Sequence, residues 1–85
     1  MNLKINFSAG ISDEVGMRET VITVSSNPND LLKCIEEQIG FPVRSKVGTR
    51  CMVLVNGRSI KKLIQEGATI QEGDSIMVVP YLSGG

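Results

Sequence analysis

The residues that could do chemistry in this sequence lie at its carboxyl end. The chain closes with Gly84 and Gly85, a few residues after an apolar, strand-like run. Glycine has no Cβ, so this pair could pass through a channel too narrow for other residues and adopt unusual backbone geometry. The reactive group is the α-carboxylate of Gly85, which is ionised at neutral pH. A carboxylate can attack a nucleotide phosphate to form an acyl adenylate, from which a sulfur or nitrogen nucleophile displaces the nucleotide.

The residues just before the glycine pair are candidates for partner recognition. Tyrosine and other apolar side chains are natural anchors in a partner groove, because aromatic groups dominate binding hot spots. We therefore predict partner contacts for Pro80, Tyr81, Leu82 and Ser83. The segment 81–85 is too short and too glycine-rich to pack as a regular element, so we expect a flexible tail that projects into solvent. An inert, frayed terminus is the alternative.

No other group of residues suggests catalysis. The sequence has no histidine, which removes the usual acid–base group near neutral pH and the commonest zinc ligand. Two cysteines cannot hold a four-thiolate cluster, and no glycine-rich phosphate loop follows a strand. We predict a chain that is not an enzyme alone and binds no cofactor. The ATP for adenylation would be bound by a separate enzyme.

The charge balance argues against two classes of partner. Nine basic residues offset nine acidic ones, so no global field favours nucleic acid or an anionic membrane. No run approaches the roughly 18 apolar residues of a membrane span, and we expect a cytoplasmic protein. Cys34 and Cys51 are expected to be free, buried thiols.

Six basic residues fall in a window that contains no acid. They could form a patch that steers an acidic partner protein, or they could be scattered over a solvated surface. The second interpretation is favoured, because the window spans loop, strand and turn. The six are Arg44, Lys46, Arg50, Arg58, Lys61 and Lys62.

The amino-terminal half predicts a hairpin and a helix. Residues 3–7 alternate as a half-buried strand, residues 8–17 contain turn and loop residues, and residues 20–24 form a β-branched run. Apolar residues then recur at i, i+4 and i+8 from Leu31 to Ile39, which is typical of an amphipathic helix. Asn27 suits its N-cap, Pro28 its first position and Gly40 its left-handed end.

The second half predicts further strands. Residues 40–50 are expected to be a loop, residues 51–55 a central strand, and Asn56-Gly57 a tight turn. The following stretch fits a brief strand or a single helical turn, and residues 75–79 form a last strand that Pro80 ends. The core contacts expected between these strands are Ile60, Leu63, Ile64 and Ile70. The order predicts one α+β domain over residues 1–80, with a mixed sheet packed on one helix.

Two segments carry a resemblance to a known family. They are "VNG" at residues 55–57 and "ATIQEGDSIMVVPYLSGG" at residues 68–85. The chain resembles the ubiquitin-like β-grasp sulfur carriers, which include the molybdopterin synthase small subunit and the thiamine-pathway sulfur carrier. The residues that match the family's pattern in register are Thr69, Ile70, Gly73, Asp74, Pro80, Gly84 and Gly85.

The resemblance implies a β-grasp fold and a role for the carboxyl end. A ubiquitin-activating-type adenylyltransferase would adenylate Gly85, with Gly84 as its slim neighbour. A sulfur donor, such as a cysteine desulfurase or a rhodanese-like protein, would convert Gly85 to a thiocarboxylate. An acceptor enzyme, such as the molybdopterin synthase large subunit, would take the sulfur.

The tail "YLSGG" departs from both branches of the family. Tyr81 stands where molybdopterin-type carriers often have a second proline, and the tail does not match the thiamine-type closely. Chain length favours molybdopterin as the pathway over thiamine thiazole or another sulfur-containing metabolite. A ubiquitin-like protein modifier and an inert β-grasp interaction module remain alternatives.

Overall fold

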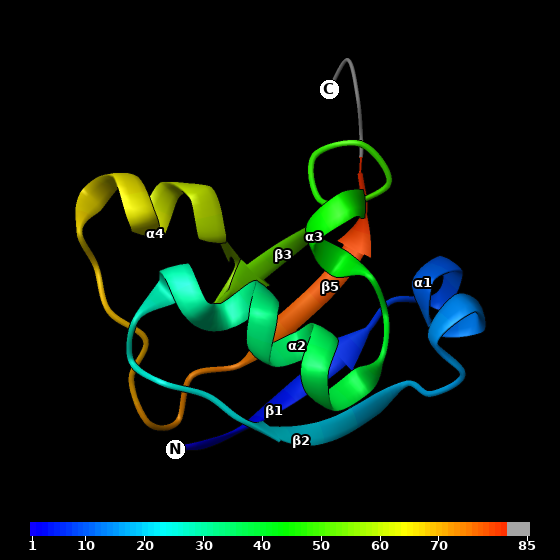
Figure 1. Ribbon diagram of the computed structural model, residues 1–85, viewed down its shortest axis with the longest axis horizontal. Helices are drawn as coiled ribbons and strands as arrows, with labels where there is room; N and C mark the ends of the chain where they lie inside the picture. Colours follow the sequence, from blue (N-terminus) through cyan, green and yellow to red (C-terminus); the bar gives the residue numbers. More distant parts are fainter. Residues whose placement is uncertain (82–85) are drawn as a thin grey trace.

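A mixed five-stranded sheet organises the computed structural model, which describes residues 1–81. The strands are β1 (Asn2–Phe7), β2 (Glu19–Thr23), β3 (Cys51–Val55), β4 (Arg58–Ser59) and β5 (Ile76–Pro80). Their order in the sheet is β2-β1-β5-β3-β4 (Figure 1). The last strand of the chain is therefore the central one, parallel to β1 and antiparallel to β3.

The longest helix lies across one face of this sheet (Figure 1). It is α2 (Leu31–Ile39), and a single 3₁₀ turn, η1 (Pro28–Asp30), leads into it. The predicted carboxyl end is confirmed, because Gly40 is left-handed with φ 85°. Asn27 caps the 3₁₀ turn, where its side chain accepts a hydrogen bond from the backbone N–H of Asn29, and α2 itself begins three residues later than predicted. The 3₁₀ turn was not predicted.

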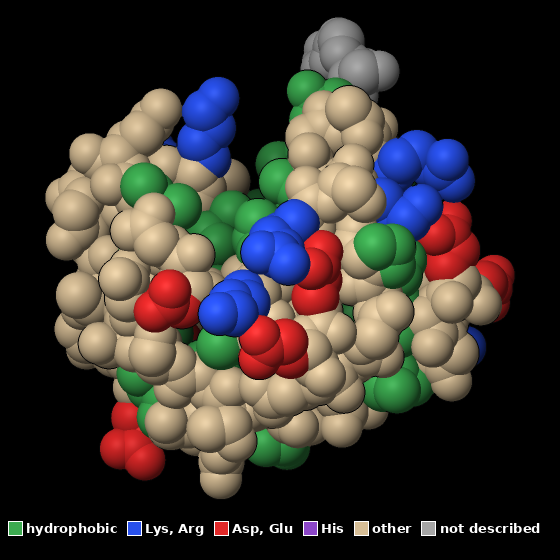
Figure 2. All heavy atoms as spheres, viewed as in Figure 1, with side chains coloured by type: hydrophobic (Ala, Val, Ile, Leu, Met, Phe, Trp, Pro, Cys, Tyr) green, Lys and Arg blue, Asp and Glu red, His purple; other side chains and the backbone are tan. Residues whose placement is uncertain are grey.

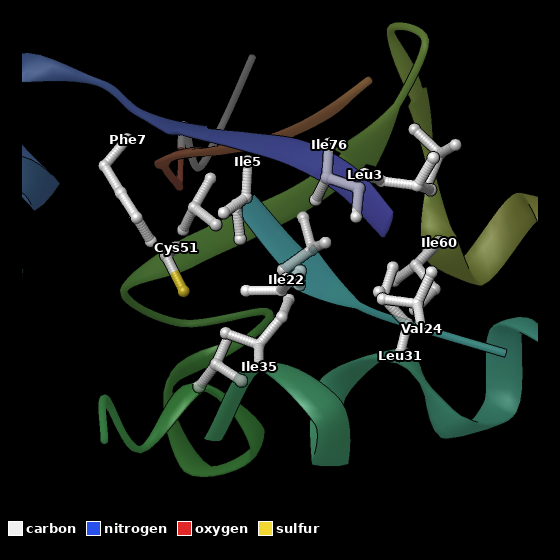
Figure 3. Close-up of a cluster of buried hydrophobic side chains, with 14 of the residues drawn as sticks. Leu3, Ile5, Phe7, Ile22, Val24, Leu31, Ile35, Cys51, Ile60 and Ile76 are labelled. Atoms are coloured by element: carbon white, nitrogen blue, oxygen red, sulfur yellow. The ribbon is translucent and has the colours of Figure 1, made fainter. Parts of the chain in front are cut away.

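The core fills the space between α2 and the sheet. Ile5 and Ile76 point from neighbouring strands toward Ile35 of α2, and all three are fully buried (Figure 3). The alternation predicted for residues 3–7 is confirmed, since Leu3, Ile5 and Phe7 all face this core. The predicted α+β class, a mixed sheet packed on one main helix, is therefore observed.

Two segments predicted as loops contain helices. The connection between β1 and β2 holds α1 (Ala9–Val15), which buries Ile11 and ends at the left-handed Gly16. Serine and glycine in α1 are typical of turns, and a single buried apolar position shows no helical period. The sequence therefore did not predict this helix. The segment 40–50 holds α3 (Val43–Lys46), which buries Val43. Four residues are too few to show a helical repeat.

The stretch after the Asn56-Gly57 turn contains both predicted alternatives in succession. The two-residue strand β4 is followed by α4 (Ile60–Glu66), which Ser59 caps by accepting a hydrogen bond from the backbone N–H of Lys62. Ile60, Leu63 and Ile70 are buried as expected, whereas Ile64 is 41% exposed, so its assignment to the core was wrong.

The last strand extends through Pro80, one residue beyond the predicted end at Val79. Pro80 is the final residue of β5 and pairs with Cys51 of β3. The ladder bond beside it comes from Tyr81, whose N–H donates to the Arg50 carbonyl. In an antiparallel ladder the neighbouring residue's N–H points the other way, toward β1. The ladder between β1 and β5 ends with the bond from the Ser8 N–H to the Val78 carbonyl, and the next bond would need the N–H that Pro80 lacks.

Candidate functional site at the end of the central strand

The predicted tail begins at the end of β5, the central strand of the sheet. Within β5, Ile76 and Val78 are fully buried, and the strand is hydrogen-bonded to neighbours on both sides. The Tyr81 N–H donates to the Arg50 carbonyl at 3.1 Å, which extends the ladder one residue past the strand. Leu82, Ser83, Gly84 and Gly85 lie outside the described residues. The structure thus fixes the root of the tail, at the upper end of the sheet in Figure 1.

Pro80 and Tyr81 are both accessible at this root. Pro80 is exposed, and the Tyr81 side chain is 39% exposed. A Cβ placed on Gly10 would lie 3.7 Å from the Pro80 Cγ, so α1 packs close to the tail root on one side. Two of the four predicted partner-binding residues therefore stand at the surface where the tail begins.

The other residues of the family pattern build the opposite end of β5. Asn56 is the one non-glycine residue with positive φ in the described chain, at 52°, and its side-chain amide donates to Asp74 Oδ1 at 2.8 Å. The side-chain oxygen of Asn56, Oδ1, accepts a hydrogen bond from the Ser75 N–H at 2.9 Å. Gly73 has φ 90°, a conformation that side chains other than glycine's rarely adopt. These residues align β3 with β5 and thereby direct the tail.

Apolar side chains gather on the face of the sheet opposite α2. Met77 of β5 pairs with Leu54 of β3, and Val79 pairs with Met52, so all four project from the same face. Met77 is 44% exposed, and the other three are half-buried. We call Met52, Leu54, Met77 and Val79 the open-face patch. Met77 and Val79 therefore both lie on the side of the sheet away from the core.

A hollow of about 280 Å³ lies beside the tail root. It forms because β4 pairs only with the last two residues of β3, so the first part of β3 has no strand next to it on the side away from β5. Figure 2 shows green, apolar side chains at the floor of a hollow in the upper half of the view. Its lining residues are Val47, Gly48, Met52, Val53, Ser59, Ile60, Lys61 and Tyr81.

Sequence reasoning missed this hollow, although part of the signal was present. The lining comes from four segments that are separated along the chain, so no local spacing predicts it. Continuous apolar runs at residues 51–55 and 76–79 do indicate strands with apolar side chains on both faces. That signal anticipates the open-face patch, which shares Met52 with the hollow.

The basic window separates into paired and unpaired members. Its three arginines form ion pairs, Arg44 with Glu36, Arg50 with Glu14, and Arg58 with Glu66. Within residues 1–81, no ion pair involves its three lysines, Lys46, Lys61 and Lys62. The window is thus neither one continuous patch nor wholly scattered, and Lys61 is the member that lines the hollow.

Glu36 has a structural role that the sequence did not reveal. Its carboxylate accepts from the Arg44 backbone N–H at 2.7 Å and from Arg44 Nε at 2.8 Å, which joins the end of α2 to the start of α3. The backbone hydrogen bond from Arg44 is the main cause that holds the pKa of Glu36 below its ordinary value. This ion pair supports the segment that leads to the hollow.

The two thiols differ in their surroundings. Cys51 is fully buried as predicted, and burial raises the pKa of its thiol. Cys34 was also predicted to be buried, but it is only half-buried and packs against the edge of the core, because it lies at the flank of the α2 stripe. In the described part of the chain, no cluster of three potential ligands could hold a metal ion. Across residues 1–81, every helix is too short or too polar to cross a membrane.

One family of known proteins matches nearly the whole chain. The sequence model of the ThiS family aligns with residues 6–85, which includes β5 and the terminal glycine pair. The chain belongs to the ThiS family. No curated protein matches the sequence.

Solved structures support the same fold for this ThiS-family chain. A putative molybdopterin converting factor, subunit 1, from Pyrococcus furiosus superposes with a TM-score of 0.70 at 20% identity, over 96% of this chain and 99% of that one. SAMP1 from Haloferax volcanii gives 0.69 at 19% identity over the full length of both chains. These neighbours confirm the ubiquitin-like β-grasp fold.

A third neighbour comes from a complex. It is the protein-protein complex of subunits 1 and 2 of the molybdopterin-converting factor from Helicobacter pylori 26695, with a TM-score of 0.62 at 20% identity over all of both chains. The identities are low enough that these likenesses concern the fold. Molybdopterin-converting-factor subunits and small archaeal modifier proteins are both among the chain's structural relatives.

Proposed function

We propose that this chain is a sulfur carrier whose C-terminal carboxylate is activated and converted to a thiocarboxylate. A ubiquitin-activating-type adenylyltransferase binds ATP and joins AMP to the Gly85 carboxylate. The terminal sulfur of a persulfide on a cysteine desulfurase or rhodanese-like donor then displaces AMP and forms an acyl disulfide, which a second thiol of the enzymes cleaves to leave the Gly85 thiocarboxylate and a disulfide between the two cysteines. Gly84 is the slim neighbour that lets the end enter both active sites. The chain itself supplies the reactive group and leaves catalysis to its partners.

The observation that carries this proposal is the attachment of a Gly-Gly terminus to the central strand in a ThiS-family chain. β5 is hydrogen-bonded on both sides, and its ladder continues to Tyr81. A rigid base reduces the conformational entropy that an enzyme must remove when it positions the carboxylate. The remaining four residues are long enough to reach about 13 Å into a partner's active site.

The acceptor we propose is an enzyme of cofactor biosynthesis, and molybdopterin is the first candidate. Support comes from the likeness to subunit 1 of molybdopterin-converting factors, one of which was solved together with its subunit 2. The open-face patch is the surface on which such an enzyme docks, because exposed apolar groups beside the tail root gain most from burial. Thiamine thiazole is the alternative acceptor pathway.

Deletion of Gly85 tests the carrier role. The truncated chain should fold normally, since the described core ends well before this residue, and it should transfer no sulfur to an acceptor enzyme. A matched control is Ser83→Ala, which leaves the glycine pair intact and should retain transfer. Normal sulfur transfer by the chain that lacks Gly85 would refute the proposal.

A second candidate function is supported by the likeness to SAMP1, a small archaeal modifier protein by name. In that role, Gly85 would be joined to lysine amines of other proteins after the same adenylation. Isolation of conjugates from the source cells, followed by peptide sequencing across the linkage, distinguishes the two. Isopeptides that begin at Gly85 would establish modification, and their absence with sulfur present on Gly85 would favour the carrier.

A further inference from the structure

The hollow beside Tyr81 has a chemical character of its own. Its floor and walls are mostly apolar, with Val47, Met52 and Ile60 among them, and Lys61 is the charged group of its lining. At about 280 Å³ it is just below the usual size of small-molecule sites, so it suits one or two side chains. It is contiguous with the open-face patch through Met52.

The charges around the hollow have one sign. The segments that line it before Tyr81 lie between residues 47 and 61, and the sequence contains no acidic residue from 38 to 65. The three arginines of that stretch are neutralised by glutamates from other elements. The lysines form no ion pair within residues 1–81, so the rim of the hollow keeps a local positive charge.

We propose that this hollow receives an apolar side chain and an adjacent carboxylate from the enzyme that activates the tail. This inference rests on the proposed function, since it assigns the hollow to the enzyme that handles Gly85. The apolar group fills the gap that β4 leaves beside β3, and the carboxylate pairs with Lys61. Such a contact lies next to the point where the tail enters the enzyme.

The position of the hollow explains why the activating enzyme is its occupant. Tyr81 is both a wall of the hollow and the root of the tail, with its N–H bonded to Arg50. An enzyme that encloses the tail must cover this wall. An anchor there orients the carrier about the axis of the tail. Charge complementarity with Lys61 also speeds encounter.

The chain offers a matched pair of variants for a test. Lys61 and Lys62 are neighbours in the first turn of α4, and both are exposed, but Lys61 alone lines the hollow. Lys61→Glu and Lys62→Glu make the same change of charge. An acid in a first helical turn is favoured by the helix dipole, so neither variant should destabilise α4.

The first experiment is an NMR titration of the full chain with a blocked peptide that contains a leucine followed by an aspartate. We expect saturable shifts at the amides of Gly48, Val53 and Lys61. Lys61→Glu should weaken binding about fivefold, as expected for loss of an exposed ion pair, and Lys62→Glu less than twofold. Equal binding of a peptide with asparagine in place of aspartate, or shifts confined to the open-face patch, would overturn the proposal.

Removal of residues 82–85 tests whether the chain's own tail, and not the activating enzyme, occupies the hollow. If this deletion shifts the hollow amides without added peptide, the chain's own tail fills the hollow and the proposal fails. The enzymatic arm measures adenylation of Gly85, where Lys61→Glu should raise KM about fivefold with kcat unchanged. An unchanged KM refutes the docking inference alone, whereas failure of the unmodified chain to be adenylated refutes the proposed function.

Discussion

The two faces of the sheet use the same kinds of side chain for different purposes. On the face toward α2, alternate residues of β5 and β3, such as Ile76 and Val53, are almost completely buried. On the other face the intervening residues, such as Met77 and Leu54, are equally apolar but remain partly exposed. One face holds the fold together, and the other is available to a partner.

The open face is itself divided. Its β3–β5 half carries the open-face patch, next to the tail root. Its β1–β2 half carries mostly polar groups, with Lys4 paired to Glu19 and Asn2 hydrogen-bonded to Thr23. Val21 is the apolar exception there, at 60% exposure. The apolar surface of the open face is thus concentrated beside the tail root, apart from Val21.

The largest expected effect is on the free energy of unfolding, and it distinguishes the face that α2 covers from the open face. Ile76→Ala removes a fully buried side chain and should lower the free energy of unfolding by about 2–5 kcal/mol. Met77→Ala, one residue along, should cost less than about 1 kcal/mol, because that side chain is half-exposed. Urea unfolding of both variants measures the difference. Equal losses would remove the distinction between the faces.

Thiol reactivity compares the two faces of the sheet at β3. Cys51 is fully buried, and the pKa of its thiol is raised, so alkylation requires local opening. In the variant Met52→Cys, the new thiol on the open face should react at least about a hundredfold faster, equivalent to an opening of roughly 2.7 kcal/mol. Timed alkylation followed by peptide mass spectrometry gives both rates. Similar rates would show that the covered face opens easily.

A third comparison tests the two halves of the open face. Met77→Glu should lower kcat/KM for sulfur transfer to the acceptor enzyme about tenfold, because a charge replaces an apolar contact with that enzyme. Val21→Glu introduces the same charge on the polar half, opposite Lys4, and should change kcat/KM by less than about twofold. Measurement of kcat/KM with both purified variants tests this difference. A comparable loss with Val21→Glu would mean that docking is not confined to the patch.

The smallest effect concerns the support of the hollow. The pKa of Glu36 is lowered in the folded chain, so its contribution to stability is complete above its unfolded pKa, near 4.3. It is lost as pH falls through the lower, folded value. Stability profiles of the parent chain and Glu36→Gln should therefore differ at pH 6 and converge in acid. A constant difference down to the acid limit would contradict this role.

Much of the fold could be predicted because its signals are local. The alternation of Leu3, Ile5 and Phe7 and the caps at Asn27 and Gly40 each depend on a few neighbouring residues. Helices α1 and α3 escaped prediction because each buries one residue, Ile11 or Val43, which leaves no period to detect. A local sequence pattern predicts a helix or strand only when the element is long enough to repeat the pattern.

The site was predictable in its chemistry but not in its shape. Glycine at the terminus indicated the reactive group, and Pro80 and Tyr81 do stand where the tail begins. The hollow could not be predicted, because it depends on β4 pairing with only two residues of β3. That length is a property of the tertiary structure, in which α4 begins at Ile60 and takes the chain away from the sheet.

Intact-protein mass spectrometry of the chain from its native cells tests the central claim most directly. The account predicts a species in which one oxygen of the Gly85 carboxylate is replaced by sulfur. The same species should form when the purified chain is incubated with ATP, a sulfur source and the activating enzyme of those cells. A terminus that stays unmodified under both conditions would contradict the carrier role.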